Sequence, residues 1–177
     1  MRRNHARPHT DSLFFRPGWN YVQGNIVNLP VGNTETAARK LQALTGGALF
    51  RIATHPYPED YTRCTEVARQ ELRDNARPPV TGTVADMAAF GTILLGYPNW
   101  WGTMPMAVHT FLEQYNFAGK RIAPFCTHEG SGMGRSARDI ARLCPGAEVL
   151  PGLAIYGYAV ADADESLRGW LKNARIL

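Results

Sequence analysis

The sequence has 177 residues, of which 45% are hydrophobic, and its 19 basic and 15 acidic side chains give a formal net charge of +4. This length and composition are typical of one globular domain, and no apolar run approaches the roughly 18 residues that span a bilayer. Basic and acidic residues alternate, as in RQELRDNAR at 69–77, so we expect a mixed-charge surface and no nucleic-acid partner.

The first 11 residues, MRRNHARPHTD, are basic and polar and lack the apolar stretch of a secretory signal. We expect residues 1–11 to be disordered and residues 12–177 to form the domain. Cys64, Cys126 and Cys144 have no metal-ligand spacing, which is typical of free thiols in a reducing cytoplasm, although one disulfide stays open. We therefore expect a cytoplasmic protein without a metal site.

Helix-like and strand-like segments alternate from about residue 34 to the end of the chain. Strands are expected at 48–52, 91–97, 121–127 and 148–156, and helices at 34–45, 61–75, 106–115, 136–143 and 164–172. The apolar runs GTILLGY and RIAPFCT are typical of strands buried on both faces, although Pro124 removes one backbone donor. The alternation predicts an α/β fold, with helices on both faces of an open parallel sheet.

In such sheets ligands bind beyond the carboxyl ends of the strands, where three loops of this sequence are expected. The first, Val31-Gly32-Asn33-Thr34, leads into a predicted helix whose first backbone amides are unpaired and attract anions. Gly32 permits a tight turn, and the side chains of Asn33 and Thr34 can donate to phosphate oxygens. Capping of the helix by Asn33 or Thr34 explains the same residues, so both interpretations stay open.

The second loop, at 97–105, directly follows the strand GTILLGY and contains Trp100 and Trp101. Two adjacent indole rings in a loop framed by glycine and proline cannot both enter one core. At least one of them is therefore expected to face solvent or a planar aromatic ligand. The alternative is a hydrophobic latch that packs on a helix.

The third loop, THEGSGMG at 127–134, follows the strand RIAPFCT. His128 and Glu129 form the only titratable pair at a predicted strand end, so we predict them as catalytic residues that supply a proton and control charge. Ordinary loop polarity is the alternative. Gly130, Gly132 and Gly134 let a ligand approach the backbone closely. Thr127 and Ser131 add hydroxyl groups that can bond to it.

Three motifs together, VGNTE at 31–35, LGYPNWWGTMP at 95–105 and PFCTHEGSGMGRS at 124–136, resemble a bacterial group of the flavodoxin-like superfamily. The resemblance runs from about residue 14 to the C-terminus. It implies a five-stranded parallel sheet in the order 2-1-3-4-5, with FMN bound at its carboxyl edge.

The resemblance also implies where FMN lies. Its phosphate would bind a split loop formed by residues 15–18 and 31–34, with an insertion at 19–30 between the two halves. Residues 98–102 would flank the isoalloxazine ring, and residues 127–132 would wrap its other side. The FMN-binding residues implied are Arg16, Gly18, Gly32, Asn33, Thr34, Pro98, Asn99, Trp100, Trp101, Gly102, Thr127, His128, Gly130, Ser131 and Gly132.

A redox protein that works through FMN is the function that this resemblance implies. One possibility is an enzyme that takes hydride from NAD(P)H and reduces a quinone-like acceptor, and another is an electron carrier for a redox protein partner. Carrier flavodoxins are typically acidic, so the positive net charge favours the enzyme. A non-catalytic interaction module stays open, because Phe15 replaces the family's phosphate-binding serine and the polar run HARPHTDS at 5–12 makes a poor central strand.

Overall fold

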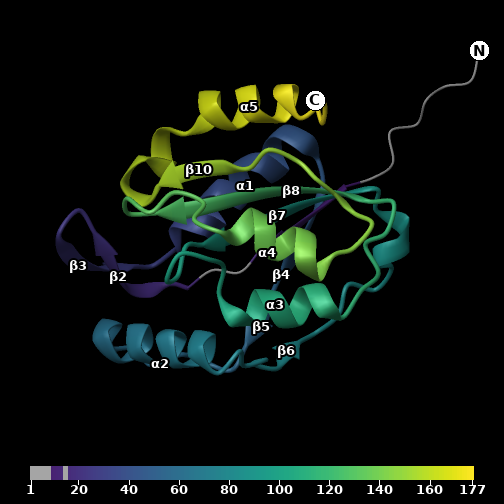
Figure 1. Ribbon diagram of the computed structural model, residues 1–177. Coiled ribbons are helices and arrows are strands. Elements are labelled where there is room, and N and C mark those ends of the chain that lie inside the picture. The colour runs from purple at the N-terminus through teal and green to yellow at the C-terminus, as the bar shows by residue number, and fades with distance from the viewer. Residues whose placement is uncertain (1–8, 14–15) are drawn as a thin grey trace, which may run out of the picture.

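A parallel β-sheet runs through the centre of the protein in this computed structural model, which describes residues 9–13 and 16–177 (Figure 1). Every strand pair within this sheet is parallel. Across the sheet, the strands follow the order β4 (Ala48–Arg51), β1 (His9–Leu13), β7 (Thr92–Pro98), β8 (Arg121–His128) and β10 (Leu153–Tyr156). The sheet has six strands where five were expected, because β9 (Glu148–Val149) also pairs with β8.

Helices cover both faces of this sheet (Figure 1). On one face lie α1 (Asn33–Thr45) and α5 (Asp164–Asn173), and on the other lie α3 (Met106–Glu113) and α4 (Ser136–Leu143). Helix α2 (Tyr61–Arg73) packs beside α3, and the short 3-10 helices η1 (Met87–Ala89) and η2 (Gly157–Asp162) precede β7 and α5. The predicted α/β fold with a parallel sheet is confirmed. Among the described residues, no helix has the length and apolar character needed to cross a membrane.

Two small antiparallel sheets lie outside the main one and were not predicted. Strand β5 (Ala53–Thr54) pairs with β6 (Val80–Thr81). Strands β2 (Gly18–Val22) and β3 (Asn25–Leu29) form a hairpin from the insertion at 19–30. The hairpin lies beyond the carboxyl ends of the parallel strands, where ligands bind in this class of sheet (Figure 1).

The strand predicted at 148–156 is broken into β9 and β10, and Pro124 on the neighbouring strand accounts for the position of the break. Ile122 of β8 pairs with Val149 of β9, and Phe125 pairs with Leu153 of β10. Pro124 therefore faces the gap between the two short strands, where no partner needs the backbone donor that proline lacks. The proline is accommodated inside β8 because the adjacent chain is interrupted there.

Strand β1 is a central strand of the sheet although it includes residues 9–12 of the polar run that was expected to make a poor one. It lies between β4 and β7 and pairs with both, so backbone hydrogen bonding compensates for its polar sequence. It begins at His9, within the segment 1–11 that the sequence set apart from the domain. Phe15, which replaces the expected serine, lies outside the described residues.

Alternate residues of β7 supply the two halves of the core. Leu95 and Tyr97 pack towards Phe111 of α3, whereas Leu94 packs towards Leu167 of α5. This alternation follows from the two-residue period of a strand that is covered on both faces. All three cysteines are buried and free, so the disulfide that the sequence left open does not form.

His109 on α3 is a buried histidine, 3% exposed, and neither ring nitrogen has a hydrogen-bond partner among the described residues. Burial lowers its pKa from 6.5 to about 4. The nearby Asp139 carboxylate favours the protonated ring, while Arg77 and Arg142 oppose it. A neutral imidazole is therefore built into the packing between α3 and α4.

This burial predicts acid sensitivity. Because the folded protein binds the proton more weakly than the unfolded chain, the free energy of unfolding should be highest above pH 6.5 and fall as the pH drops to about 4. The loss is at most between about 3 and 4 kcal/mol, since the shift is roughly 2.5 pKa units and one unit corresponds to about 1.4 kcal/mol. Denaturant unfolding across this pH range should show a smaller loss for His109→Leu. The exposed His55→Leu variant should behave like wild type, and equal pH profiles for all three proteins would contradict the assignment.

Candidate functional site

A cleft of about 240 Å³ opens at the carboxyl ends of β7 and β8, below the β2–β3 hairpin. We call it the main cleft. Its lining includes ten residues predicted as site residues: Arg16, Asn33, Thr34, Pro98, Asn99, Trp100, Thr127, His128, Glu129 and Ser131. A recess of about 320 Å³ shares Arg16, Asn20, Tyr61, Asn99 and Trp100 with the cleft and continues it towards α2. The structure therefore brings together residues from all three predicted loops.

The N-terminus of α1 is open towards ligands. Its N-cap is Gly32, and no side chain of the described residues caps the helix, so capping by Asn33 or Thr34 is wrong. Gly32 also lies against Arg16, because a β-carbon at Gly32 would be 3.0 Å from the Arg16 carbonyl oxygen. The two segments of the expected split loop are thus in contact. The unpaired amides at the start of this helix are a favourable environment for an anion.

Hydrogen bonds hold the three loops in fixed relation. The hydroxyls of Thr34 and Thr127 are 2.7 Å apart and buried, which ties α1 to the end of β8. The backbone N–H of Asn99 donates to the Thr127 carbonyl at 2.8 Å. The Asn99 side chain donates to the carbonyl of Gly132 at 2.6 Å and accepts from the amide of Gly102 at 3.0 Å. Asn99 therefore positions loop backbone as well as lining the cleft.

The adjacent tryptophans have different surroundings. Trp100 lines both the main cleft and the recess, and its ring meets Tyr57 edge-on at 5.1 Å. Trp101 lines only the recess, and its indole N–H donates to the Thr65 carbonyl on α2 at 3.0 Å. The guanidinium of Arg69 lies 5.0 Å from its ring centroid. Trp101 is a latch onto α2, whereas Trp100 faces the ligand space.

His128 is 8% exposed at the end of β8, with its ring centroid 4.4 Å from that of Tyr156. Its Nδ1 accepts a hydrogen bond from the amide of Gly130 at 2.9 Å. This bond places the proton of the neutral ring on Nε2. Burial lowers the pKa of His128, and the Glu129 carboxylate only partly opposes this effect. The ring is therefore a neutral hydrogen-bond donor at physiological pH.

Glu129 presents a carboxylate oxygen that the described residues leave unsatisfied. Its Oε2 accepts from the amide of Gln23 in the hairpin at 3.3 Å, while its Oε1 is buried without a partner. A β-carbon at Gly157 would overlap both this oxygen and the Asn33 side chain. A buried acceptor in this position favours a ligand that brings a hydrogen-bond donor.

Four lining residues were missed: Asn20, Tyr21, Tyr61 and Gly157. The rings of Tyr21 and Tyr61 stack at 6.4 Å, which joins the hairpin to α2. No local motif marks them, because each enters the cleft through a tertiary contact. The only signal was position, since Gly157 directly follows the last predicted strand.

Five predicted residues do not line the main cleft or its recess: Gly18, Gly32, Gly102, Gly130 and Gly132. Gly18 and Gly102 have positive φ values, 98° and 82°, and act in chain turns. Gly32 lies against the Arg16 backbone and does not line the main cleft. These glycines shape the loops, and their predicted contacts with FMN remain predictions.

The fold and the cleft can be compared with known proteins. A family model described as flavodoxin matches residues 28–174, which is more than half of the chain. The chain belongs to the flavodoxin family. No curated protein shows significant similarity to it.

Several solved structures are similar to this flavodoxin over nearly its whole length. A Bacteroides eggerthii protein provisionally assigned as a flavoprotein is 26% identical over 93% of this chain and 96% of its own, with a TM-score of 0.73. A Lactobacillus acidophilus flavoprotein in complex with FMN is 17% identical over 90% and 99%, with a TM-score of 0.62. An apo NADH:FMN oxidoreductase is 12% identical over 96% and 89%, with a TM-score of 0.56. The last two share the fold.

The close approach of the second and third loops in this flavodoxin can be tested at Gly134. Its φ is 54°, and a β-carbon there would overlap the Gly102 carbonyl, whereas Gly132 has a φ of 59° and open space. Both substitutions to alanine add left-handed backbone strain, but only Gly134→Ala must also push the loops apart. Its free energy of unfolding should fall by about 1–3 kcal/mol more than that of Gly132→Ala. Equal losses in denaturant unfolding would rule out the close contact.

Proposed function

We propose that this flavodoxin binds FMN in the main cleft and uses it to transfer electrons from NAD(P)H to a quinone-like acceptor. One observation carries the proposal: an uncapped helix N-terminus, the partly buried Trp100 and residues of a glycine-rich loop meet in one cleft at the carboxyl edge of the sheet. The FMN complex of the Lactobacillus acidophilus relative and the activity named for the oxidoreductase support it by analogy.

The residues present fit the two ends of FMN. The first amides of α1, with Asn33 and Arg16, would hold the phosphate, because they combine unpaired donors with positive charge. Trp100 would lie beside the isoalloxazine ring, with backbone groups of 127–132 on the other side. The unsatisfied Oε1 of Glu129 would accept from a hydroxyl or ring N–H of the ligand.

The chain's own contribution to the reaction is binding, orientation and hydrogen bonding. FMN, when bound, would supply the redox chemistry of hydride and electron transfer. His128, held neutral by burial and with its proton on Nε2, is a hydrogen-bond donor beside the cleft. Glu129 adds negative charge that the described residues leave only partly satisfied, and this charge would disfavour additional electron density on a neighbouring group. The three buried, free thiols support a cytoplasmic location as part of this proposal.

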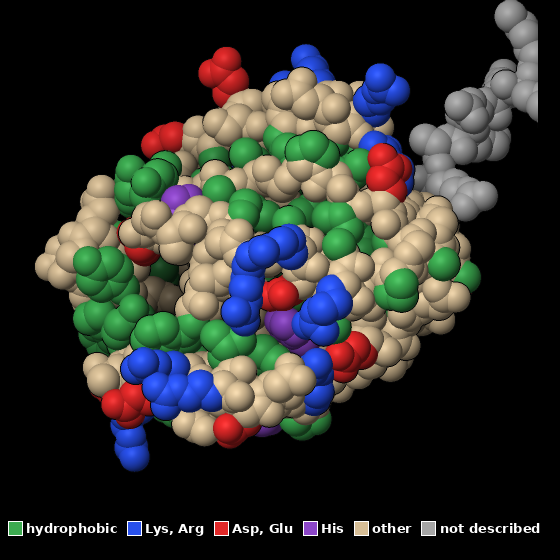
Figure 2. Space-filling model, in the orientation of Figure 1, with side chains coloured by type: hydrophobic (Ala, Val, Ile, Leu, Met, Phe, Trp, Pro, Cys, Tyr) green, Lys and Arg blue, Asp and Glu red, His purple; other side chains and the backbone are tan. Residues whose placement is uncertain are grey.

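An electron carrier for a redox protein partner is the second candidate, and the hairpin favours it. Trp19, Tyr21, Ile26 and Val27 are between 38% and 46% exposed beside the cleft. Figure 2 shows hydrophobic side chains gathered on this side of the protein. Exposed apolar surface at the rim of a redox site is typical of protein docking. The positive net charge favours a small anionic substrate instead.

Turnover with purified protein separates these candidates. We expect the protein to retain FMN through gel filtration and, with NADH or NADPH, to reduce benzoquinone faster than an equal concentration of free FMN. The reason is that a fixed cleft orients donor and acceptor at the flavin. Retained FMN without such turnover, but with rapid reduction by a reductase protein, would favour the carrier. Failure to retain FMN would favour the third possibility, a non-catalytic interaction module.

The unequal surroundings of the two tryptophans give a matched pair of variants. Trp100→Ala should raise the dissociation constant for FMN about tenfold or more, because aromatic stacking on a planar ring contributes roughly 1–3 kcal/mol. Trp101→Ala should change it much less, since that ring is latched to α2. Fluorescence titration of apoprotein with FMN measures both. A larger effect at Trp101 would contradict the placement of the ring beside Trp100.

A further inference from the structure

The recess that continues the main cleft towards α2 has a volume of about 320 Å³, which is in the range of sites for small organic molecules. Three residues line the recess and not the main cleft: Cys64, Thr65 and Trp101. The FMN binding that we propose uses the main cleft, so these three residues have no assigned ligand. The recess is therefore open to a second ligand that lies next to the flavin.

Trp101 is held against the recess at a conformational cost. Its φ is 55°, in the left-handed region that bulky residues rarely adopt. Two contacts with α2 fix the indole there, because its N–H donates to the Thr65 carbonyl at 3.0 Å and the Arg69 guanidinium lies 5.0 Å from the ring centroid. Strained backbone that is held by surrounding contacts is frequent at ligand sites. The Trp101 ring is thus a fixed wall of the recess, although the residue is 49% exposed.

Neutral groups form most of the lining. Tyr61, Trp100 and Trp101 supply aromatic rings, and burial raises the pKa of Cys64, so its thiol keeps its proton. Flat aromatic walls around a small cavity match a planar ring.

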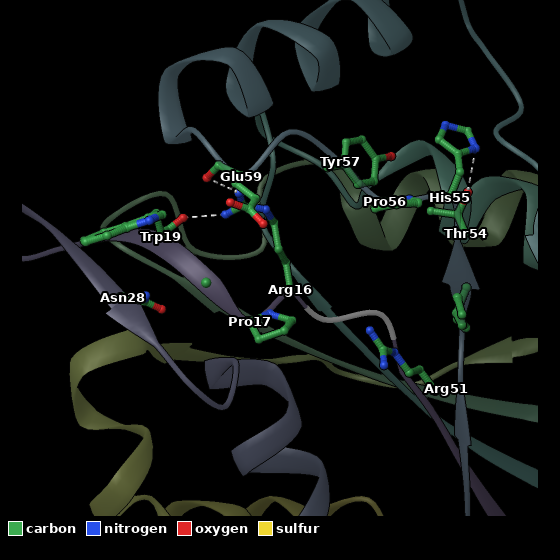
Figure 3. A pocket seen from close by; sticks show the side chains of 13 residues that line it. Arg16, Pro17, Trp19, Asn28, Arg51, Thr54, His55, Pro56, Tyr57 and Glu59 are labelled. Carbon is green, nitrogen blue, oxygen red and sulfur yellow. Dashed lines mark hydrogen bonds between the residues drawn. The ribbon is translucent and has the colours of Figure 1, made fainter.

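Arg16 is the one charged side chain in the described lining of the recess. Three of its five N–H donors bond to the backbone carbonyls of Trp19, Pro58 and Glu59. Figure 3 shows its guanidinium directed towards Trp19 and Glu59. Under the proposed function, the FMN phosphate would also balance its charge. Little of this cation is therefore left for a second anion, and the recess favours a neutral ligand.

Tyr61 supplies a hydrogen-bond donor where the recess joins the main cleft. Its ring stacks on Tyr21 at 6.4 Å, but its hydroxyl makes no hydrogen bond to any residue that the structure describes. Burial is the largest of the causes that raise the pKa of Tyr61, so the hydroxyl keeps its proton at physiological pH. The side chain of Asn99, by contrast, is already bonded to loop backbone through both of its polar groups. A free phenol beside aromatic walls matches a planar ring that carries a carbonyl acceptor.

We propose that the recess binds a neutral, planar carbonyl compound of the quinone class, with its ring against Trp101 and a carbonyl oxygen accepting from the Tyr61 hydroxyl. This assigns the acceptor of the proposed function to a subsite that shares Tyr61, Asn99 and Trp100 with the main cleft. A ring bound there lies next to the flavin and does not displace it. Its role as electron acceptor rests on the proposed function, whereas its binding is measured without turnover.

Three tetramethylated rings test the chemistry: duroquinone, durene, which lacks carbonyl groups, and the anion tetramethylbenzoate. The methyl groups of duroquinone block addition of thiols such as Cys64. Equilibrium dialysis with the full chain, with and without FMN, measures binding. Duroquinone should bind at a single site, and tetramethylbenzoate should bind more weakly, because the recess has little free positive charge for it.

The Tyr61 hydroxyl is tested by a matched pair of variants. Tyr61→Phe should weaken duroquinone binding about fivefold, because a hydrogen bond between neutral groups is lost, and should leave durene binding unchanged. Tyr158 on η2 is 49% exposed and lines neither cavity. Tyr158→Phe, which also removes one hydroxyl, should therefore bind both probes like wild type.

Trp101→Ala assigns the binding to the recess. It should weaken duroquinone and durene alike, by roughly fivefold or more, and change FMN binding little, because this ring lines only the recess. Trp19→Ala removes an indole that is 45% exposed and lines neither cavity, so it should bind both probes like wild type.

Four outcomes would each overturn the proposal: release of FMN by duroquinone, tighter binding of tetramethylbenzoate than of duroquinone, a Tyr61→Phe variant that binds duroquinone like wild type, or a Trp101→Ala variant that binds both rings like wild type. Duroquinone binding that depends on Tyr61 and Trp101, in protein that retains no FMN, would support the binding site while refuting the proposed function.

Discussion

The site depends on one constraint, the parallel register of β7 and β8. Pro98 at the end of β7 pairs with Thr127 near the end of β8, and the next amide, that of Asn99, donates to the Thr127 carbonyl. Both strands therefore end at the same level, and the loops that follow them leave the sheet side by side. The side chain of Asn99 then bonds to Gly132 and Gly102, so the geometry of the strands extends into both loops.

The remaining walls of the cleft are attached to this pair. The hydroxyl contact between Thr34 and Thr127 brings the N-terminus of α1 to β8, and with it the open amides that suit an anion. The hairpin is held from two sides, by the stacking of Tyr21 on Tyr61 and by the bond from the Gln23 amide to Glu129. Trp19, Tyr21, Ile26 and Val27 are between 38% and 46% exposed, so the hairpin contributes little buried apolar surface to this wall.

Burial determines the chemistry of the titratable groups. His128 and Glu129 are neighbours in sequence, yet they take different roles, because the imidazole is buried as a neutral donor and the carboxylate bridges towards the hairpin. His109 shows the same physics away from the site, where desolvation is the largest cause of its lowered pKa.

The sequence by itself determined the α/β class, the strands β7 and β8 and the three loops, because long apolar runs and glycine-rich turns act locally. It could not determine which side chains face the ligand space. Trp100 and Trp101 are equivalent by pattern, and only the contacts of Trp101 with Thr65 and Arg69 distinguish them. Strand β1, the break between β9 and β10 and the hairpin were decided by tertiary structure. The physical reason is that a polar strand forms when flanking strands satisfy its backbone, and a proline is tolerated where the adjacent chain requires no donor.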